Sequence, residues 1–183
     1  MRYHMYTSHA FSFLLADICL LVLFVVPFLT LGQSSSSAMA PDAKFAADAA
    51  QGGMAEVKLG QLAEQNGSSD AVKAFGRRMV QDHSKAGDEL KQAAQTAGIT
   101  LPADISSKDQ SMYDELAKLK GAAFDRAYAR MMVHDHEEDV KEFQKESQSG
   151  QNEQIRSFAT KTLPTLQEHL QQARQMQQSV SAS

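Results

Sequence analysis

Apolar residues recur every three or four positions in each long segment that follows residue 40. This spacing places them on one face of an α-helix, and no segment shows the strict alternation that is typical of a β-strand. The composition agrees, because tryptophan is absent and the helix-forming residues Ala, Gln, Glu, Lys and Leu are abundant. The sequence therefore predicts an all-α protein.

Glycine, proline and helix-capping residues divide the chain into four long helices and a short one. The long helices are expected over residues 42–65, 70–97, 122–148 and 153–178, and the short helix over residues 107–119. Short loops join the first two and the last two long helices, so each pair should form an antiparallel hairpin. The short helix lies in the crossover. This order predicts a ferritin-like antiparallel four-helix bundle over residues 41–178, followed by a frayed tail at residues 179–183.

The start of the chain has the pattern of an export signal. An apolar run at Phe11–Leu31 follows Arg2 and precedes the small-residue stretch GQSSSSAMA. This order is typical of a secretory signal peptide, which we expect at residues 1–40, with cleavage after Ala38 or Ala40.

The same apolar run is long enough to span a bilayer as an uncleaved anchor. Asp17 and Pro27 argue against that alternative, because a central aspartate costs roughly 2.5–3.5 kcal/mol on insertion scales. We expect secretion across the inner membrane, into the periplasm or to an outer-membrane-associated site, and membrane contact only through the leader or an envelope partner. The single cysteine, Cys19, lies in the leader, so the mature chain has no disulfide or thiolate ligand.

Charge and motif content exclude several classes of function. The net charge is -4, with acidic and basic residues interspersed along the chain. A nucleic-acid-binding protein would show a basic stripe, so no nucleic-acid partner is expected. The sequence contains neither a phosphate-binding glycine loop nor an HExxH zinc motif. It leaves the oligomeric state open.

The pattern Met-Val-x-Asp-His occurs twice, ending at His83 and at His136. Each of these histidines lies within the apolar stripe of its helix, and Glu56 and His169 lie on the stripes of the other two long helices. At about 1.5 Å per residue, the two members of each hairpin differ in height by about one helical turn. We therefore expect one polar layer near the middle of the bundle, with a side chain from each long helix.

Burying three histidines and a glutamate is costly unless a partner satisfies their polar atoms. A metal ion, water and mutual hydrogen bonds are the alternatives. Imidazole and carboxylate donors suit a single Zn, Cu, Fe or Mn ion. The candidate metal ligands are Glu56, His83, His136 and His169, and no catalytic residue is predicted.

Side chains beside the candidate ligands have simpler interpretations. Met79 and Met132 lie one turn before the histidines and are expected to fill the core, with thioether ligation of Cu(I) as the alternative. Asp82 and Asp135 point about 100° away from the histidines that follow them. A solvated face is therefore favoured over a supporting role behind the ligands, with Arg78 as the (i, i+4) partner of Asp82.

Three further features are expected to be structural. His134 points off the apolar stripe and should be exposed. The acidic run within residues 137–142 should form a solvated face. The pair Gly52 and Gly53 should allow a close helix approach or a kink beside Glu56, because glycine weakens a helix without adding a side chain.

The motifs lie in the stretches GGMAEVKLGQLA (52–63), FGRRMVQDHSKAGDEL (75–90), GAAFDRAYARMMVHDHEEDVKEF (121–143) and TLPTLQEHL (162–170). These stretches resemble the bacterial family known as domain of unknown function 4142, over nearly the whole mature chain. Members are typically exported, are often labelled outer-membrane proteins and are grouped with ferritin-like folds. The resemblance implies fold and export without an established activity, and it places Glu56, His83, His136 and His169 at recurring motif positions.

The chain departs from the di-iron proteins of the ferritin-like group, which supply Glu-x-x-His from two helices. Here Val80, Val133 and Leu166 stand three residues before the histidines. This departure favours a single ion over a carboxylate-rich centre. Three functions stay open: metal handling or stress protection, a metal-free structural or interaction module of the envelope, and a metal-dependent redox enzyme.

Overall fold

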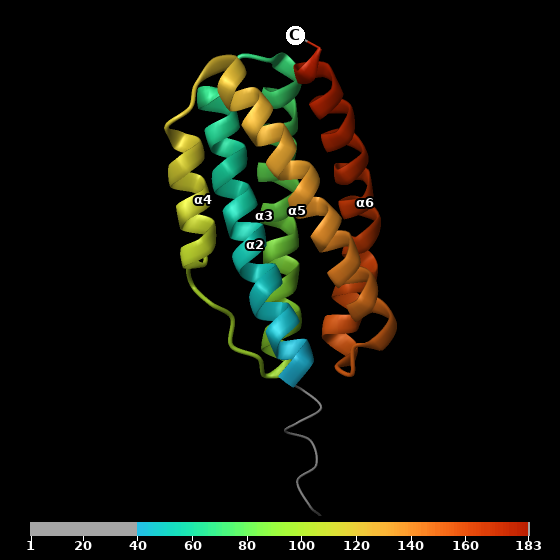
Figure 1. The fold of residues 1–183 in the computed structure, drawn as a ribbon. Helices are drawn as coiled ribbons and strands as arrows, with labels where there is room; N and C mark the ends of the chain where they lie inside the picture. Colours follow the sequence, from blue (N-terminus) through green and yellow to red (C-terminus); the bar gives the residue numbers. More distant parts are fainter. Residues whose placement is uncertain (1–39, 183) are drawn as a thin grey trace, which may run out of the picture. The chain divides into compact units, whose positions relative to one another are not determined.

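The computed structural model describes residues 40–182, and every regular element within them is an α-helix (Figure 1). The elements are α2 (Ala40–Asn66), α3 (Asp70–Ala97), α4 (Ser107–Ala117), α5 (Gly121–Ser149) and α6 (Glu153–Ser181). The all-α prediction is confirmed for this part of the chain, and each predicted helix boundary is within three residues of the observed one.

The signal peptide predicted for residues 1–40 lies outside the described residues, apart from Ala40, where α2 begins. Among the described residues, no helix combines the length and the hydrophobicity that crossing a membrane requires.

The four long helices lie side by side and pair in the order expected from the short loops (Figure 1). The most extensive packing is between α2 and α3 and between α5 and α6. The two hairpins meet mainly through α3 and α6, and also through α2 and α5, while α4 packs against α2. The polar side chains of the four long helices can therefore meet in the interior.

A buried aspartate of each hairpin holds the loop of the other hairpin. Asp125 of α5 accepts hydrogen bonds from the backbone N–H groups of Ser68 (3.0 Å) and Ser69 (2.9 Å) in the α2–α3 loop. Asp42 of α2 accepts from the backbone N–H groups of Gln151 (3.1 Å) and Asn152 (2.6 Å) in the α5–α6 loop. Both carboxylates lie beside helix N-termini, where negative charge is favourable. These two contacts fix the hairpins against each other.

The core consists of two apolar clusters separated along the helix axes. One cluster includes Leu59, Phe75, Met79, Tyr128, Met132, Ala173 and Val180. The other includes Phe45, Leu90, Phe143, Ile155, Phe158 and Leu166. In each long helix a short stretch separates the residues of the two clusters, and the predicted polar residues fall in these stretches.

Residues 179–181, which belong to the predicted frayed tail at residues 179–183, are helical. Helix α6 continues to Ser181, because Val180 is buried and joins the first apolar cluster. Burial of an apolar side chain stabilises the last turn, which the polar neighbours alone would not do.

The closest approach of α2 and α3 is at Gly60 and Gly76, not at the Gly52–Gly53 pair as expected. A Cβ atom added at Gly60 would lie 2.5 Å from the carbonyl oxygen of Gly76, and one added at Gly76 would lie 2.6 Å from that of Gly60. A Cβ atom added at Gly52 would meet nothing within 4 Å. The close approach of α2 and α3 therefore requires glycine at Gly60, about two helical turns after the Gly52–Gly53 pair.

We predict opposite effects for two alanine substitutions in α2. Gly52→Ala should raise the free energy of unfolding by about 0.5–1 kcal/mol, because alanine favours the helix and fits the space. Gly60→Ala should lower it by about 1–3 kcal/mol, because the new methyl group overlaps the backbone of α3. Urea unfolding followed by circular dichroism measures both. Equal effects of the two substitutions would contradict the observed helix crossing.

A second carboxyl group, that of Glu146, lies near Asp42. Glu146 of α5 is buried, and burial together with the charge of Asp42 raises its pKa to about 7. An unfolded glutamate titrates near pH 4.3, so between about pH 4.3 and 7 the folded chain holds a proton that the unfolded chain has lost. This group therefore stabilises the fold less as the pH rises through that range.

We predict that Glu146→Gln becomes progressively more stable than the wild type as the pH rises from 5 to 8, because the variant has no carboxyl group to ionise there. Urea unfolding at several pH values measures the difference. The control is Gln144→Asn, at an exposed position on the same helix, which changes no titratable group, so its difference from the wild type should stay constant. A pH-independent difference for Glu146→Gln would contradict this account.

Candidate metal centre

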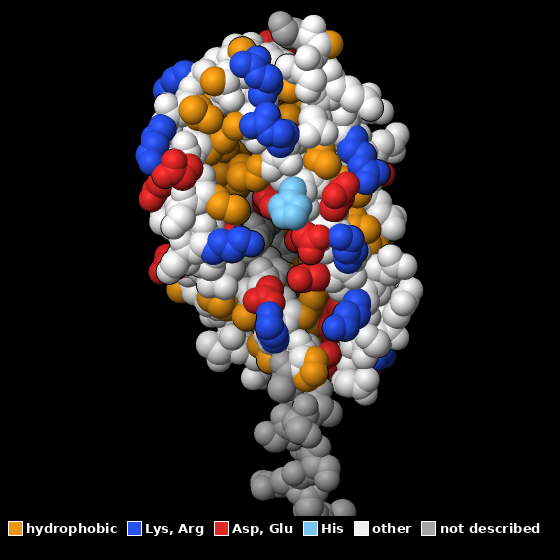
Figure 2. All heavy atoms as spheres, viewed as in Figure 1, with side chains coloured by type: hydrophobic (Ala, Val, Ile, Leu, Met, Phe, Trp, Pro, Cys, Tyr) orange, Lys and Arg blue, Asp and Glu red, His pale blue; other side chains and the backbone are white. Residues whose placement is uncertain are grey.

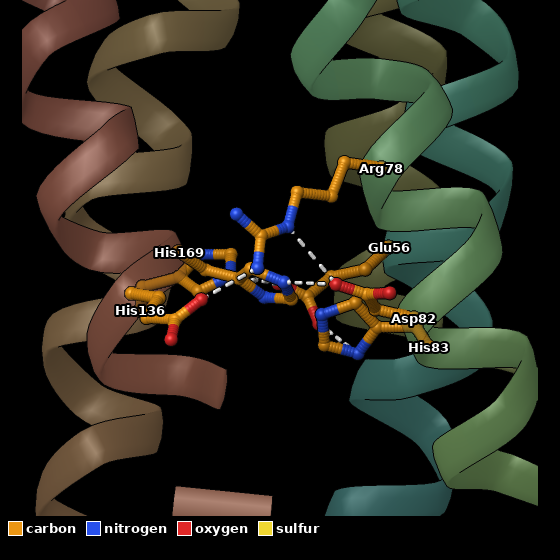
Figure 3. A network of polar contacts seen from close by, with 7 residues as sticks. Glu56, Arg78, Asp82, His83, His136 and His169 are labelled. Atoms are coloured by element: carbon orange, nitrogen blue, oxygen red, sulfur yellow. Dashed lines mark hydrogen bonds and ion pairs between the residues drawn. The ribbon is translucent and has the colours of Figure 1, made fainter. Parts of the chain in front are cut away.

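Each long helix brings one polar side chain to the boundary between the two apolar clusters. Glu56 comes from α2, His83 from α3, His136 from α5 and His169 from α6, and none is more than 8% exposed. Figure 3 shows the side chains of the two hairpins meeting in the middle. The imidazole centroids are 5.9 Å apart for His83–His136, 5.3 Å for His83–His169 and 5.4 Å for His136–His169. All four residues that the sequence nominated thus share one layer.

The carboxylate of Glu56 lies between two of the histidines. Its Oε2 atom is 2.9 Å from Nδ1 of His83, and its Oε1 atom is 3.3 Å from Nε2 of His136. The contact with His83 joins the two helices of the first hairpin, and the contact with His136 reaches across to the second. Glu56 therefore links the hairpins at the level of the layer.

Each histidine is anchored through one ring nitrogen. Nδ1 of His136 lies 2.9 Å from the carbonyl oxygen of Met132, and Nε2 of His169 lies 2.8 Å from Oδ2 of Asp82. A carbonyl or carboxylate oxygen can only accept, so these two nitrogens carry the proton and donate. Nδ1 of His83 donates to Glu56 in the same way. These anchors fix the orientation of each ring, and they fix the tautomer of the ring wherever it is neutral.

The other ring nitrogen of each histidine has no hydrogen-bond partner within the described part of the protein. The unpartnered buried atoms of the layer are Nε2 of His83, Nε2 of His136, Nδ1 of His169 and Oε1 of Glu56. With Nδ1 of His136 protonated, its Nε2 atom and Glu56 Oε1 are two acceptors that face each other at 3.3 Å. Such a buried arrangement is unfavourable unless a proton or a cation lies between the two atoms.

One ring nitrogen from each of His83, His136 and His169 lies within 4.8 Å of the other two. Neutral imidazole is a common ligand for Zn, Cu, Fe and Ni ions. Two nitrogens bonded at about 2.0–2.1 Å to one ion lie at most about 4.2 Å apart, so the rings need to move closer by a small amount to bind one ion together. The three buried histidines could therefore hold a metal ion.

The charge states of the layer follow from burial and from Glu56. Burial lowers the pKa of His169 to about 4, against the opposing hydrogen bond to Asp82, and burial also lowers the pKa of His136. These two rings are therefore neutral at pH 7, which is the form that binds metals. Burial also acts to lower the pKa of His83, but the charge of Glu56 outweighs it and the pKa is raised.

The same pairing acts on Glu56 in the opposite direction. Burial acts to raise its pKa, but the charge of His83, the charge that His136 carries when it is protonated in acid, and the hydrogen bond from His83 together lower it. Without an ion, the contact between Glu56 and His83 thus favours the charged form of both groups.

Asp82 has the supporting role behind a candidate ligand that the sequence favoured less than a solvated position. Its carboxylate is 27% exposed and binds His169 on the facing helix, and it also accepts from Nε of Arg78 at 3.1 Å. Arg78 is therefore the predicted (i, i+4) partner, and it reaches on to Glu168 at 2.8 Å. Figure 3 shows this network beside the layer. The interpretation of Asp82 as merely solvated is wrong, because the side chain points towards α6 rather than into water.

The acidic residues of α5 are not uniformly solvated either. His134 and Glu138 are exposed as expected, but Asp135 and Asp139 are half-buried. Burial, and then the charge of Glu56, raise the pKa of Asp135 to about 6 and raise the pKa of Asp139 well above its usual value. On the face drawn in Figure 2, acidic side chains gather beside a hollow.

The two sides of the layer differ in packing. On one side lie Met79, Met132 and Tyr128, all fully buried, and Phe75, whose ring meets His136 and His169 edge-on at 6.1 and 6.4 Å. The prediction that both methionines fill the core is confirmed. On the other side, a cavity of about 1090 Å³ reaches the layer at Glu56 and His83.

Together, the fold and the site define an all-helical protein that buries a layer of three histidines and one glutamate between its helices. The chain belongs to the family described as domain of unknown function (DUF4142), whose model matches residues 29–176. This match confirms the resemblance seen in the sequence. Neither a curated protein nor a solved structure matches the chain.

We predict that Glu56→Gln lowers the pKa of His83 in the metal-free protein below the usual value of about 6.5, because burial then acts without the carboxylate charge. Nuclear magnetic resonance titration of the imidazole signals measures this pKa. Glu138→Gln removes an exposed carboxylate of α5 and should leave the His83 pKa unchanged. An unaltered pKa in Glu56→Gln would rule out Glu56 as the partner that charges His83.

Proposed function

We propose that the chain is an exported ferritin-like four-helix bundle of the periplasm or outer membrane that binds one transition-metal ion for metal handling or stress protection. The ligands are Glu56, His83, His136 and His169. The observation that carries the proposal is the set of buried polar atoms, one from each long helix, that have no hydrogen-bond partner among residues 40–182. The apolar run at Phe11–Leu31 supports export.

The contacts around the layer fit a metal centre. Metal-bound histidine usually donates its second N–H to a carboxylate or a backbone carbonyl, which fixes the ring. Here Asp82 accepts this hydrogen bond from His169, and the carbonyl oxygen of Met132 accepts it from His136. For His83 to bind an ion through Nε2, it must give up the extra proton that pairs with Glu56. Three nitrogen donors and one oxygen donor suit Zn, Cu, Fe or Mn.

A second candidate is a metal-free structural or interaction module of the cell envelope. The Glu56–His83 ion pair and the Asp82–His169 hydrogen bond favour it, because both form between helices without an ion. A buried polar group can fix helix register in this way. The two candidates differ in one measurable quantity, the metal content of the purified protein.

We predict about one ion per chain in untagged protein that has been purified after export under metal-replete conditions. The double variant His83→Ala/His136→Ala should lose the ion, because it removes two of the three imidazoles. His134→Ala removes an exposed histidine of α5 and should keep it. Elemental analysis measures all three proteins. A wild type that contains no metal, and whose thermal stability does not change when Zn, Cu, Fe or Mn is added, would contradict the metal centre and favour the metal-free structural module.

A further inference from the structure

A cavity of about 1090 Å³ lies between the helices beside the second apolar cluster. Its apolar lining includes Ala49, Ala86, Leu90, Phe143, Phe158 and Leu166. Pockets that bind small organic molecules typically measure about 300–1,000 Å³ and combine such a lining with a few polar groups. This cavity is large enough for a small molecule, and the polar groups that line it beside the layer are Glu56, His83 and Asp139.

Two helical glycines keep the cavity open beside the polar layer. Gly52 and Gly53 of α2 both line it. Glycine inside a helix lowers stability unless close packing requires it. No close packing requires it here, because an added Cβ atom would meet nothing within 4 Å at Gly52, and at Gly53 its nearest neighbour is His83 Nδ1 at 3.9 Å. The missing side chains leave room next to His83.

The polar end of the cavity offers unpartnered atoms. Glu56 is 5% exposed and His83 is 8% exposed, and each has a buried polar atom, Oε1 and Nε2 respectively, without a hydrogen-bond partner in the described residues. The opposite side of the layer is closed by Phe75, Met79 and Met132. A molecule can therefore approach an ion in the layer from the cavity side.

We propose that the cavity binds a small, mostly apolar monocarboxylate whose chain lies against the apolar lining and whose carboxylate reaches the ion. This inference rests on the proposed metal centre. A divalent ion with three neutral imidazoles and one carboxylate leaves one positive charge in a buried layer, which an anionic head group neutralises. Without the ion, the charge of Glu56 repels the same head group.

Octanoate and 1-octanol are the probes, because they share an apolar chain and differ in the charge of the head group. Each is titrated calorimetrically into the full chain, either loaded with Zn(II) or stripped of metal. Octanoate should bind at least about tenfold more tightly to the zinc-loaded protein, whereas the affinity for 1-octanol should change less than about threefold. Octanoate affinity that is independent of zinc would overturn the proposal.

Gly53→Leu places a side chain in the cavity beside His83, and Ala49→Leu fills it farther from the layer. Each should weaken octanoate binding at least about tenfold while the zinc content stays at that of the wild type. Gln65→Leu adds the same side chain at an exposed position of α2 outside the cavity and should bind octanoate as the wild type does.

Three results would overturn the inference in distinguishable ways. Zinc bound in the wild type without any octanoate binding would overturn the ligand and leave the metal centre intact. Octanoate binding that both zinc-loaded leucine variants retain would show that the ligand lies elsewhere. A wild type that binds none of Zn, Cu, Fe and Mn would overturn the metal centre and, with it, this inference.

Discussion

The structure depends on one energetic constraint, the burial of four polar side chains between two apolar clusters. Glu56, His83, His136 and His169 each leave a buried polar atom without a hydrogen-bond partner among the described residues, and each such atom costs free energy unless something satisfies it. Apolar residues at these positions would pack without that cost. A layer that combines this cost with rings held in defined tautomers is better explained as a binding site than as core filling.

The rest of the fold holds that layer in place. Asp42 and Asp125 tie each hairpin loop to the opposite hairpin, so the heights of the helices are fixed from both ends. The glycines at the α2–α3 crossing bring these two helices close together, which places Glu56 within reach of His83. The close packing around Phe75 and the open cavity on the other side give the layer one accessible face. Different parts of the chain therefore set the position of the layer, the orientation of its rings and the access of other molecules to it.

Much of this was predictable because helical periodicity and loop length are local properties of the sequence. The apolar stripes located the helices, and counting residues from the loops placed Glu56 and the three histidines at one level. The contacts that depend on which helices are neighbours were not predictable in this way. Asp82 meets His169 only because α3 packs against α6, and the loop clamp at Asp42 joins residues more than a hundred positions apart.

Smaller errors have the same origin. Gly52 and Gly53 were expected to allow a close helix approach or a kink. The close approach lies at Gly60 and Gly76 instead, because three-dimensional packing sets the point where two helices cross. The buried Val180 extends α6 for the same reason, since its partners lie on distant segments. Sequence reasoning thus located the donor atoms, while the structure located their supports and the cavity beside them.

The central claim is that one ion lies within the layer, and anomalous X-ray diffraction from crystals of the metal-loaded protein tests it most directly. The account predicts a single anomalous peak within bonding distance of His83 Nε2, His136 Nε2, His169 Nδ1 and Glu56 Oε1. A layer without a peak, in which the Glu56–His83 ion pair persists in crystals that contain the metal, would contradict it.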